Sequence, residues 1–171
     1  IGTDGRWSST RVRELLAAGE VAEAAAQLGR WHAVDGMVVH GDHRGRLLGF
    51  PTANLGGRIE GMIPADGVYA GWLERRGLAA DAPDRVLPAA ISIGTNPTFD
   101  GVDRRVEGYV LDRTDLDLYG EPIRYSFVAR LRPTMRFDGI EPLIAQMNLD
   151  VSDCRRILRA TPARGTSLGP A

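Results

Sequence analysis

The sequence predicts a mainly β protein, an antiparallel barrel or sandwich flanked by helices. Between residues 31 and 137, short β-leaning runs are separated by clusters of Gly, Pro and Asp. Apolar residues at helical spacing occur before and after this region but not regularly within it. The strands therefore do not alternate with helices, which favours antiparallel pairing over a sheet built from βαβ units.

Residues 8–29 are predicted to be helical. Apolar residues at helical spacing follow a hydroxyl-rich start, and the candidate N-caps are Ser8, Ser9 and Thr10. Gly19 is expected to interrupt the helical pattern, and Gly29 is expected to end the second, alanine-rich part. We expect two short helices joined at Gly19.

The β-leaning runs follow in order. They lie at residues 35–41, 66–73, 85–94, 104–112 and 122–131. Pro51 is expected to lead into a further extended segment. Between the runs at 85–94 and 104–112, residues 96–99 (Asn-Pro-Thr-Phe) are predicted to form a turn.

The chain then returns to helix. Asp138 and Glu141 have the spacing of a capping box. A regular apolar stripe follows, formed by Ile140, Leu143, Ile144, Met147, Val151, Cys154 and Leu158. We interpret Leu143 and Met147 as core residues and Cys154 as a buried structural thiol. The predicted units are a helical segment at 1–29, a main domain at 30–159 and a disordered tail at 160–171.

Composition excludes several classes of function. The formal charge is -1, which gives no general attraction to nucleic acid or to anionic membranes, and no apolar run approaches membrane-spanning length. All 21 basic residues are arginine. A phosphate-binding loop of the Walker type and Schiff-base chemistry both require lysine, so both are excluded. A single cysteine fits a cytoplasmic protein without disulfides.

Residues 40–54, HGDHRGRLLGFPTAN, hold the first candidate site. Glycines let backbone amides approach a polyphosphate closely. In an extended segment after Pro51, Thr52 and Asn54 project from one face, because side chains alternate along a strand. A hydroxyl and an amide oxygen side by side suit Mg²⁺, which takes few protein ligands. The alternative is a glycine-rich hairpin in which Thr52 and Asn54 only satisfy a turn.

Glu107 is the second candidate. On a strand it shares one face with Tyr109 and Leu111, whereas Val106 and Val110 occupy the other. A carboxylate among apolar and aromatic neighbours can accept a proton from a substrate. The alternative is an exposed strand glutamate without a role. His32, His40 and His43 lack a zinc-ligand pattern and are interpreted as surface or turn residues.

The sequence resembles the riboflavin kinase family. GFPTAN (49–54) resembles the G-x-P-T-A-N signature of that family, and further blocks follow in the family's order. They are PADGVYA (64–70), SIGTNPTF (92–99), VEGYVLD with DLYG (106–112 and 117–120) and RPTMRFDGIEPLIAQMNLDV (132–151). The resemblance implies a small closed, Greek-key-like antiparallel β-barrel of about six strands with a C-terminal helix packed on it. Arg113 departs from the family, because many relatives carry an aromatic residue there.

The resemblance also implies roles for individual residues. Glu107 would be the catalytic base, and Thr52 and Asn54 would be the ligands of Mg²⁺ bound with ATP. The nucleotide-binding residues would be Gly41, Arg46, Gly49, Pro51, Thr52 and Asn54. The flavin-binding residues would be Asn96, Thr98, Met135, Arg136, Phe137 and Ile140.

The implied reaction is ATP-dependent phosphorylation of the ribityl 5′-hydroxyl of riboflavin, which gives FMN and ADP. Residues 8–30 resemble the end of the adenylyltransferase module of bacterial two-activity FAD synthetases, so we expect a remnant of that module here and no FAD formation by this chain. One alternative is a non-catalytic barrel that binds flavin or nucleotide, but such a protein would not need Thr52, Asn54 and Glu107 together. A nucleic-acid-binding barrel is disfavoured by the neutral charge.

Overall fold

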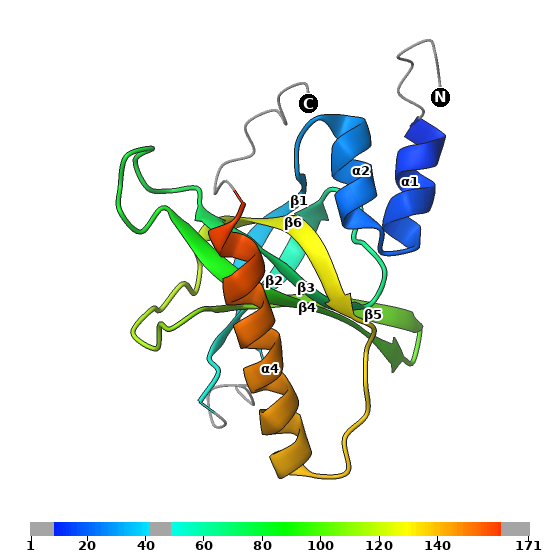
Figure 1. Cartoon of the computed structure of the whole chain (residues 1–171), viewed down its shortest axis with the longest axis vertical. Coiled ribbons are helices and arrows are strands. Elements are labelled where there is room, and N and C mark those ends of the chain that lie inside the picture. The colour runs from blue at the N-terminus through cyan, green and yellow to red at the C-terminus, as the bar shows by residue number, and fades with distance from the viewer. Residues whose placement is uncertain (1–8, 42–48, 162–171) are drawn as a thin grey trace.

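The computed structural model describes residues 9–41 and 49–161. Helices stand at both ends of the described chain, with a β-barrel between them (Figure 1). The elements are α1 (Ser9–Ala17), α2 (Val21–Leu28), β1 (His32–Val39), β2 (Thr52–Glu60), β3 (Gly67–Arg75), β4 (Val86–Thr98), β5 (Gly101–Val110), β6 (Pro122–Arg132) and α4 (Ile140–Arg159). The predicted mainly β class is confirmed.

The strands close into a barrel in the order β1-β2-β5-β4-β3-β6, and every neighbouring pair is antiparallel. β3, β4 and β5 follow one another as a meander, whereas β2 lies beside β5 rather than beside β3. This crossing gives the Greek-key-like order that the resemblance implies. Closure leaves no long sheet edge unpaired, and it brings β2 next to β5, which matters for the site.

Alternation along the strands separates a solid interior from an outer face. On β5, Val106 and Val110 are buried inside the barrel, whereas Glu107 and Tyr109 lie on the outside and are half-buried. Tyr69, Tyr125 and Phe127 are the largest fully buried side chains of the interior. The barrel is therefore a packed core.

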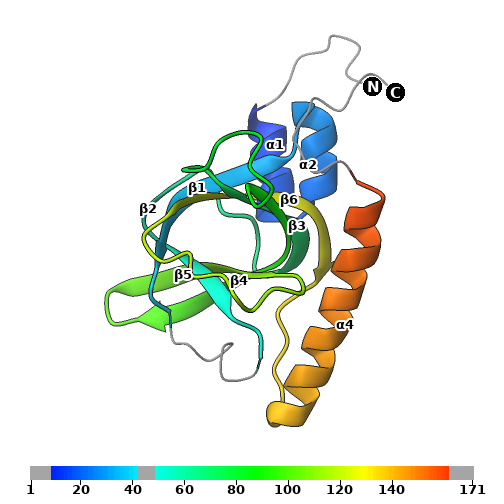
Figure 2. The ribbon, with the colours of Figure 1, turned by 90° about the vertical axis from the view of Figure 1, so that its left-hand side faces the viewer.

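The helices α1 and α2 close one end of the barrel (Figure 2). Leu15, Leu16 and Val21 belong to the same buried cluster as the barrel interior. The predicted break and end are both confirmed: Gly19 has φ +80° between the helices, and Gly29 has φ +72° at the end of α2. Ser9 and Thr10 lie within α1, and the remaining candidate cap, Ser8, lies outside the described residues.

The C-terminal helix α4 packs on the outside of the barrel against β3, β4 and β6 (Figures 1 and 2). Trp72, Leu111, Val128 and Leu158 form a second buried cluster there, together with Cys154. The buried thiol is confirmed, and burial raises the pKa of Cys154 to about 12. The helix explains why residues 67–73 of β3 are buried on both faces.

The predicted capping box at the start of α4 is wrong. The helix begins at Ile140, so its N-cap is Gly139 (φ +128°), and no side chain caps it. Glu141 is then the second residue of the helix rather than the third, and Asp138 lies one position too early to cap it. Glycine at this position adopts a backbone conformation that other residues avoid, and this sets the start of the helix.

Two other local predictions also differ from the structure. β4 continues through Asn96 and Pro97 to Thr98, so the turn falls at Phe99 and Asp100 rather than at residues 96–99. Pairing of Asn96 with Asp103 across the hairpin holds this segment extended. His32 is buried and bonded to the Met62 carbonyl at 2.6 Å, so it is not a surface or turn residue.

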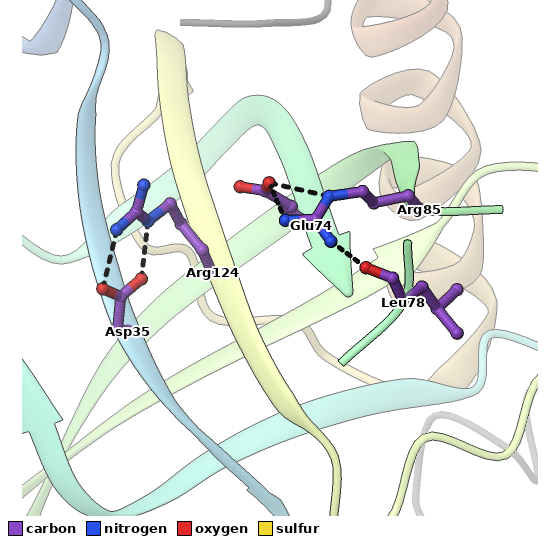
Figure 3. Close-up of polar contacts among 5 residues, drawn as sticks. All are labelled: Asp35, Glu74, Leu78, Arg85 and Arg124. Carbon is purple, nitrogen blue, oxygen red and sulfur yellow. Dashed lines mark hydrogen bonds and ion pairs between the residues drawn. The ribbon is translucent and has the colours of Figure 1, made fainter. Parts of the chain in front are cut away.

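Arginine pairs connect neighbouring strands on the outer surface (Figure 3). Arg124 on β6 donates two hydrogen bonds to Asp35 on β1, the shorter at 2.7 Å. Arg85 bonds Glu74 of β3 and the carbonyl oxygen of Leu78. These pairs are partly exposed and contribute modestly to stability, and none of these residues lines either cavity described below.

No helix in the described part of the chain is both long enough and apolar enough to cross a membrane.

Candidate active site

The residues predicted to carry the chemistry lie together on the outer face of β2 and β5. Asn54 is directly opposite Glu107, and Thr52 is directly opposite Tyr109. The Thr52 hydroxyl donates a hydrogen bond to Glu107 Oε2 at 3.2 Å, although 55 residues separate the two. Ala53, between Thr52 and Asn54, is buried on the inner face. Thr52 and Asn54 therefore share a face, as the alternation predicts.

Gly41 lies so close to Asn54 that a larger residue fits only if the Asn54 side chain moves. A Cβ atom built on Gly41 would lie 2.0 Å from the side-chain nitrogen of Asn54. Any larger residue would displace the Asn54 amide from its place beside Thr52. The absence of a side chain at Gly41 therefore lets the backbone pack against the Asn54 amide. The sequence alone indicated only a glycine-rich segment and not this contact.

A cavity of about 180 Å³ lies on one side of Thr52 and Asn54. Of the residues predicted to bind nucleotide, it contains Gly41, Pro51, Thr52 and Asn54. Gly49 does not line it, and Arg46 lies outside the described residues. The other lining residues are Val38, Val39, His40, Ala53, Gly108, Val110, Arg113, Leu116, Asp117, Leu118 and Tyr119.

Two features of this first cavity were missed from the sequence. His40 is exposed after the end of β1, as the interpretation of a surface residue implies, and it also stacks on Tyr119 with ring centroids 3.8 Å apart, so it forms part of the cavity wall; His43 lies outside the described residues. Arg113 is held by hydrogen bonds to Asp84 and Asp115. Those bonds lower the pKa of Asp115 to about 2 and raise that of Arg113. Arg113 thus forms a fixed, charge-compensated wall.

A second cavity of about 450 Å³ lies on the other side of Thr52, between the outer face of the barrel and α4. Glu107 lines this cavity, and Thr52 lines both cavities. The other lining residues are Phe50, Gly67, Val68, Ala90, Ser92, Gly94, Asn96, Arg105, Tyr109, Arg132, Thr134, Met135, Phe137, Leu143, Met147, Asp150 and Val151. The two cavities therefore meet at the Thr52–Glu107 hydrogen bond.

Half of the predicted flavin-binding residues lie in the second cavity. Asn96, Met135 and Phe137 line it, whereas Thr98, Arg136 and Ile140 line neither cavity. Ile140 is 61% exposed at the start of α4. The three residues outside the cavity are near it in sequence but not in its wall.

The interpretation of Leu143 and Met147 as core residues is wrong. Both are half-buried and line the second cavity, because α4 turns the N-terminal part of its apolar stripe toward the cavity and only the C-terminal part toward the barrel. Phe50 and Tyr109 were also missed; their rings meet edge to face at 5.3 Å. The alternation that placed Glu107 could have found Tyr109, which is on the same face.

One charged pair lies in the wall of the second cavity. Arg132 at the end of β6 donates to both carboxylate oxygens of Asp150 on α4, at 2.8 and 2.9 Å. Gln146 donates to the same carboxylate, and the Arg132 guanidinium lies 5.8 Å from the Phe137 ring centre. This network ties α4 and the segment after β6 to the barrel, and it adds a charged pair to the wall of the second cavity.

The donor set suits Mg²⁺ bound together with a phosphate group. Thr52 and Asn54 offer two neutral oxygen atoms side by side at the mouth of the first cavity. Within residues 9–41 and 49–161, no group of three or more His, Cys, Asp or Glu side chains could hold a metal by itself. Mg²⁺ accepts one or two protein ligands when phosphates and water supply the rest, so the residues present fit that ion.

Comparisons with known proteins show the family to which the chain is similar. The sequence model of the riboflavin kinase family matches residues 28–158. The bifunctional riboflavin kinase/FMN adenylyltransferase of Escherichia coli strain K12 is 39% identical over 91% of this chain and 47% of its own length. The riboflavin kinase of Mus musculus is 34% identical over 72% of this chain and 78% of its own. This chain thus spans about half the length of the bifunctional relatives.

A solved structure shares the barrel. The crystal structure of a macrolide-efflux protein from Streptococcus pneumoniae superimposes with a TM-score of 0.77 at 37% identity, over 88% of this chain and 47% of that one. That name describes the other protein, and what the two share is the sequence and fold of the matched region.

Proposed function

The chain belongs to the riboflavin kinase family, the enzymes that phosphorylate riboflavin with ATP, and we propose that its two cavities hold the two substrates on either side of Thr52. The first cavity takes the phosphates of ATP, and the second takes riboflavin. The observation that carries this proposal is the meeting of both cavities at the hydrogen bond between Thr52 and Glu107. A phosphate on one side and a hydroxyl on the other would meet there.

The shape and lining of the second cavity support flavin binding. A flat ring system needs an apolar slot with a few polar groups. Tyr109 and Phe50 supply aromatic surface on the barrel side, and Leu143 and Met147 supply apolar surface on α4. Ser92 lies directly opposite Glu107 on the neighbouring strand, so a polar ribityl chain finds hydrogen-bonding groups next to the carboxylate.

In the first cavity, Thr52 and Asn54 would hold Mg²⁺ together with the ATP phosphates. When bound, the ion would neutralise part of the charge on the phosphates, as phosphoryl transfer requires. Gly41 lets the backbone lie against Asn54 and keeps the amide beside Thr52. Because the chain has no lysine, phosphate binding depends on these groups, on backbone amides and on arginine.

Glu107 orients the ribityl 5′-hydroxyl and accepts its proton. The hydroxyl oxygen forms a bond to the γ-phosphorus, the bond from that phosphorus to the ADP oxygen breaks, and the hydroxyl proton passes to a carboxylate oxygen of Glu107. The hydroxyl is a very weak acid, so the proton leaves late in the transfer. Thr52 donates to Glu107 Oε2 and so helps to fix the carboxylate in place.

We further propose that the full-length parent protein also adenylylates FMN to FAD through a separate module before α1. The bifunctional relative from Escherichia coli supports the presence of this module, since the chain spans only 47% of its length. The cytoplasm is the proposed compartment, because the only cysteine, Cys154, is a buried free thiol.

The test is a pair of matched glutamate variants. Glu107→Gln keeps the shape of the side chain but cannot accept the proton, so FMN formation should fall by about two to four orders of magnitude while ADP affinity is unchanged. Glu60→Gln, on the exposed end of β2 and outside both cavities, should retain full activity. FMN is measured by chromatography.

Undiminished turnover of Glu107→Gln would remove Glu107 from its role. Tight flavin binding by the unmodified chain without any FMN formation would instead indicate a non-catalytic flavin-binding barrel.

A further inference from the structure

A buried hydroxyl group lies beneath the two strands that carry the site. Tyr125 on β6 is fully buried in the barrel and lies across its interior from β2 and β5. Its hydroxyl donates a hydrogen bond to the Ala53 carbonyl oxygen at 2.6 Å. Ala53 stands between Thr52 and Asn54, so this bond reaches the site from inside.

The same side chain touches the opposite strand. Ala53 is paired with Gly108, which follows Glu107. A Cβ atom on Gly108 would lie 2.4 Å from Tyr125 Cε1 and 2.6 Å from its hydroxyl oxygen. The end of the tyrosine therefore rests against the backbone of both strands at one point. On the outer face, that point is surrounded by Thr52, Asn54 and Glu107.

The segment of β2 at this point has few other restraints. β2 pairs with β5 only at residues 52–54, and the register with β1 begins at Asn54. Among the described residues, Thr52 and Ala53 are thus paired with a strand on one side only. The peptide plane that contains the Ala53 carbonyl also contains the Asn54 nitrogen and Cα. A bond to that carbonyl consequently restrains the position of the Asn54 Cα, from which the Asn54 side chain leaves the backbone.

We propose that Tyr125 is a positioning residue, whose hydroxyl sets the relative placement of Thr52 and Asn54 for Mg²⁺-nucleotide binding without touching a substrate. This proposal rests on the proposed function of Thr52 and Asn54. Removing the hydroxyl takes one hydrogen-bond partner from a buried carbonyl, and a peptide plane that turns to compensate moves Asn54 with it.

The chain offers a matched control. Tyr69 is equally buried, and its hydroxyl likewise donates to an alanine carbonyl, that of Ala65, at 2.5 Å. Ala65 precedes β3, and neither residue lines a cavity. Tyr125→Phe and Tyr69→Phe each remove one buried hydroxyl, so both should lower the melting temperature to a similar degree.

The experiment measures ADP binding by titration calorimetry with and without Mg²⁺, beside FMN formation as a function of Mg²⁺ concentration. For Tyr125→Phe, we expect Mg²⁺-dependent ADP affinity to fall about tenfold, the effect of one buried hydrogen bond, with Mg²⁺-free binding unchanged. Tyr69→Phe should bind ADP as the unmodified protein does under both conditions.

Equal behaviour of the two phenylalanine variants would overturn the proposal, because Tyr125 would then be a structural residue only. Asn54→Ala separates this failure from failure of the proposed function. If Asn54→Ala leaves the Mg²⁺ dependence unchanged, the metal pair itself is wrong and the role of Tyr125 falls with it. If Asn54→Ala removes the Mg²⁺ dependence while Tyr125→Phe retains it, only the role of Tyr125 is refuted.

Discussion

Gly94 offers a way to fill the second cavity, the proposed flavin site, without disturbing the barrel. It lies on β4 in the lining of the second cavity, between Ser92 and Asn96 on the outer face. A Cβ atom built on Gly94 meets no other atom within 4 Å, and its backbone is not in the left-handed region. The space that this glycine leaves open is therefore the space of the cavity.

Gly94→Ala and Gly94→Val each have two opposing effects, a gain in folding stability and a loss in riboflavin binding. In a strand interior, replacing glycine by alanine gains roughly 0.5–1 kcal/mol of stability, because the unfolded chain loses conformational freedom. In the cavity, each added carbon that competes with the ligand costs about 1–3 kcal/mol of binding, or roughly 10–200-fold in kcat/KM. Alanine should lower kcat/KM for riboflavin about tenfold, and valine by about a hundredfold or more. Neither change should destabilise the fold.

The assay varies riboflavin and ATP separately, follows FMN by chromatography and records the thermal unfolding of each variant. The loss should appear for riboflavin and not for ATP, since Gly94 lines the second cavity only. Gly77→Ala is the control: a Cβ there is 4.0 Å from its nearest neighbour, Pro122, and the residue lines neither cavity. A stable Gly94→Val protein with an unchanged kcat/KM for riboflavin would show that the flavin binds elsewhere.

Two further predictions concern the fold. Leu16 is 2% exposed and belongs to the buried cluster of the barrel interior. Leu16→Ala should therefore lower the free energy of unfolding by about 2–5 kcal/mol, and urea unfolding should remain a single transition. A barrel that unfolds at the same urea concentration as in the unmodified protein would mean that α1 and α2 fold separately. Burial lowers the pKa of His32 below 6.5, while its Nε2 donates to the Met62 carbonyl. The unfolded state then binds the proton more readily, so stability should fall as the pH drops below 6.5, by at most about 1.4 kcal/mol per pH unit. Urea unfolding at several pH values should show this dependence, and His32→Gln should lack it.

The strands and the reactive face were predictable because they depend on a short-range period. Side chains alternate along any strand, so the separation of Glu107 from Val106 and Val110 needed no knowledge of the fold. The same rule placed Thr52 and Asn54 together. The start of α4 was not predictable in this way. Asp138 and Glu141 satisfy a local pattern, but the chain direction set by Gly139 moved the helix start by one residue.

The second cavity could not be predicted from periodicity, because its wall depends on how α4 is placed. The apolar stripe of α4 is continuous in the sequence, yet it serves two purposes. Cys154 and Leu158 pack on the barrel, whereas Leu143 and Met147 face the cavity. Both sets need apolar side chains at the same spacing. One end of the helix extends past the barrel core. Only this tertiary arrangement distinguishes a core residue from a cavity-lining residue.

The arrangement of the site assigns different tasks to the barrel and to the helix. Thr52, Asn54 and Glu107 lie on two paired strands of a closed barrel, and Tyr125 supports those strands from a solid interior. Groups held in this way move little relative to one another, as the alignment of a phosphate with a hydroxyl requires. The apolar wall of the second cavity is shared by the barrel strands, the segment after β6 and α4, and the Arg132–Asp150 pair attaches α4 to the barrel. Changes at Thr52, Asn54 and Glu107 should therefore act on turnover and Mg²⁺-nucleotide binding, whereas changes at Leu143 and Met147 of α4 should act on flavin affinity.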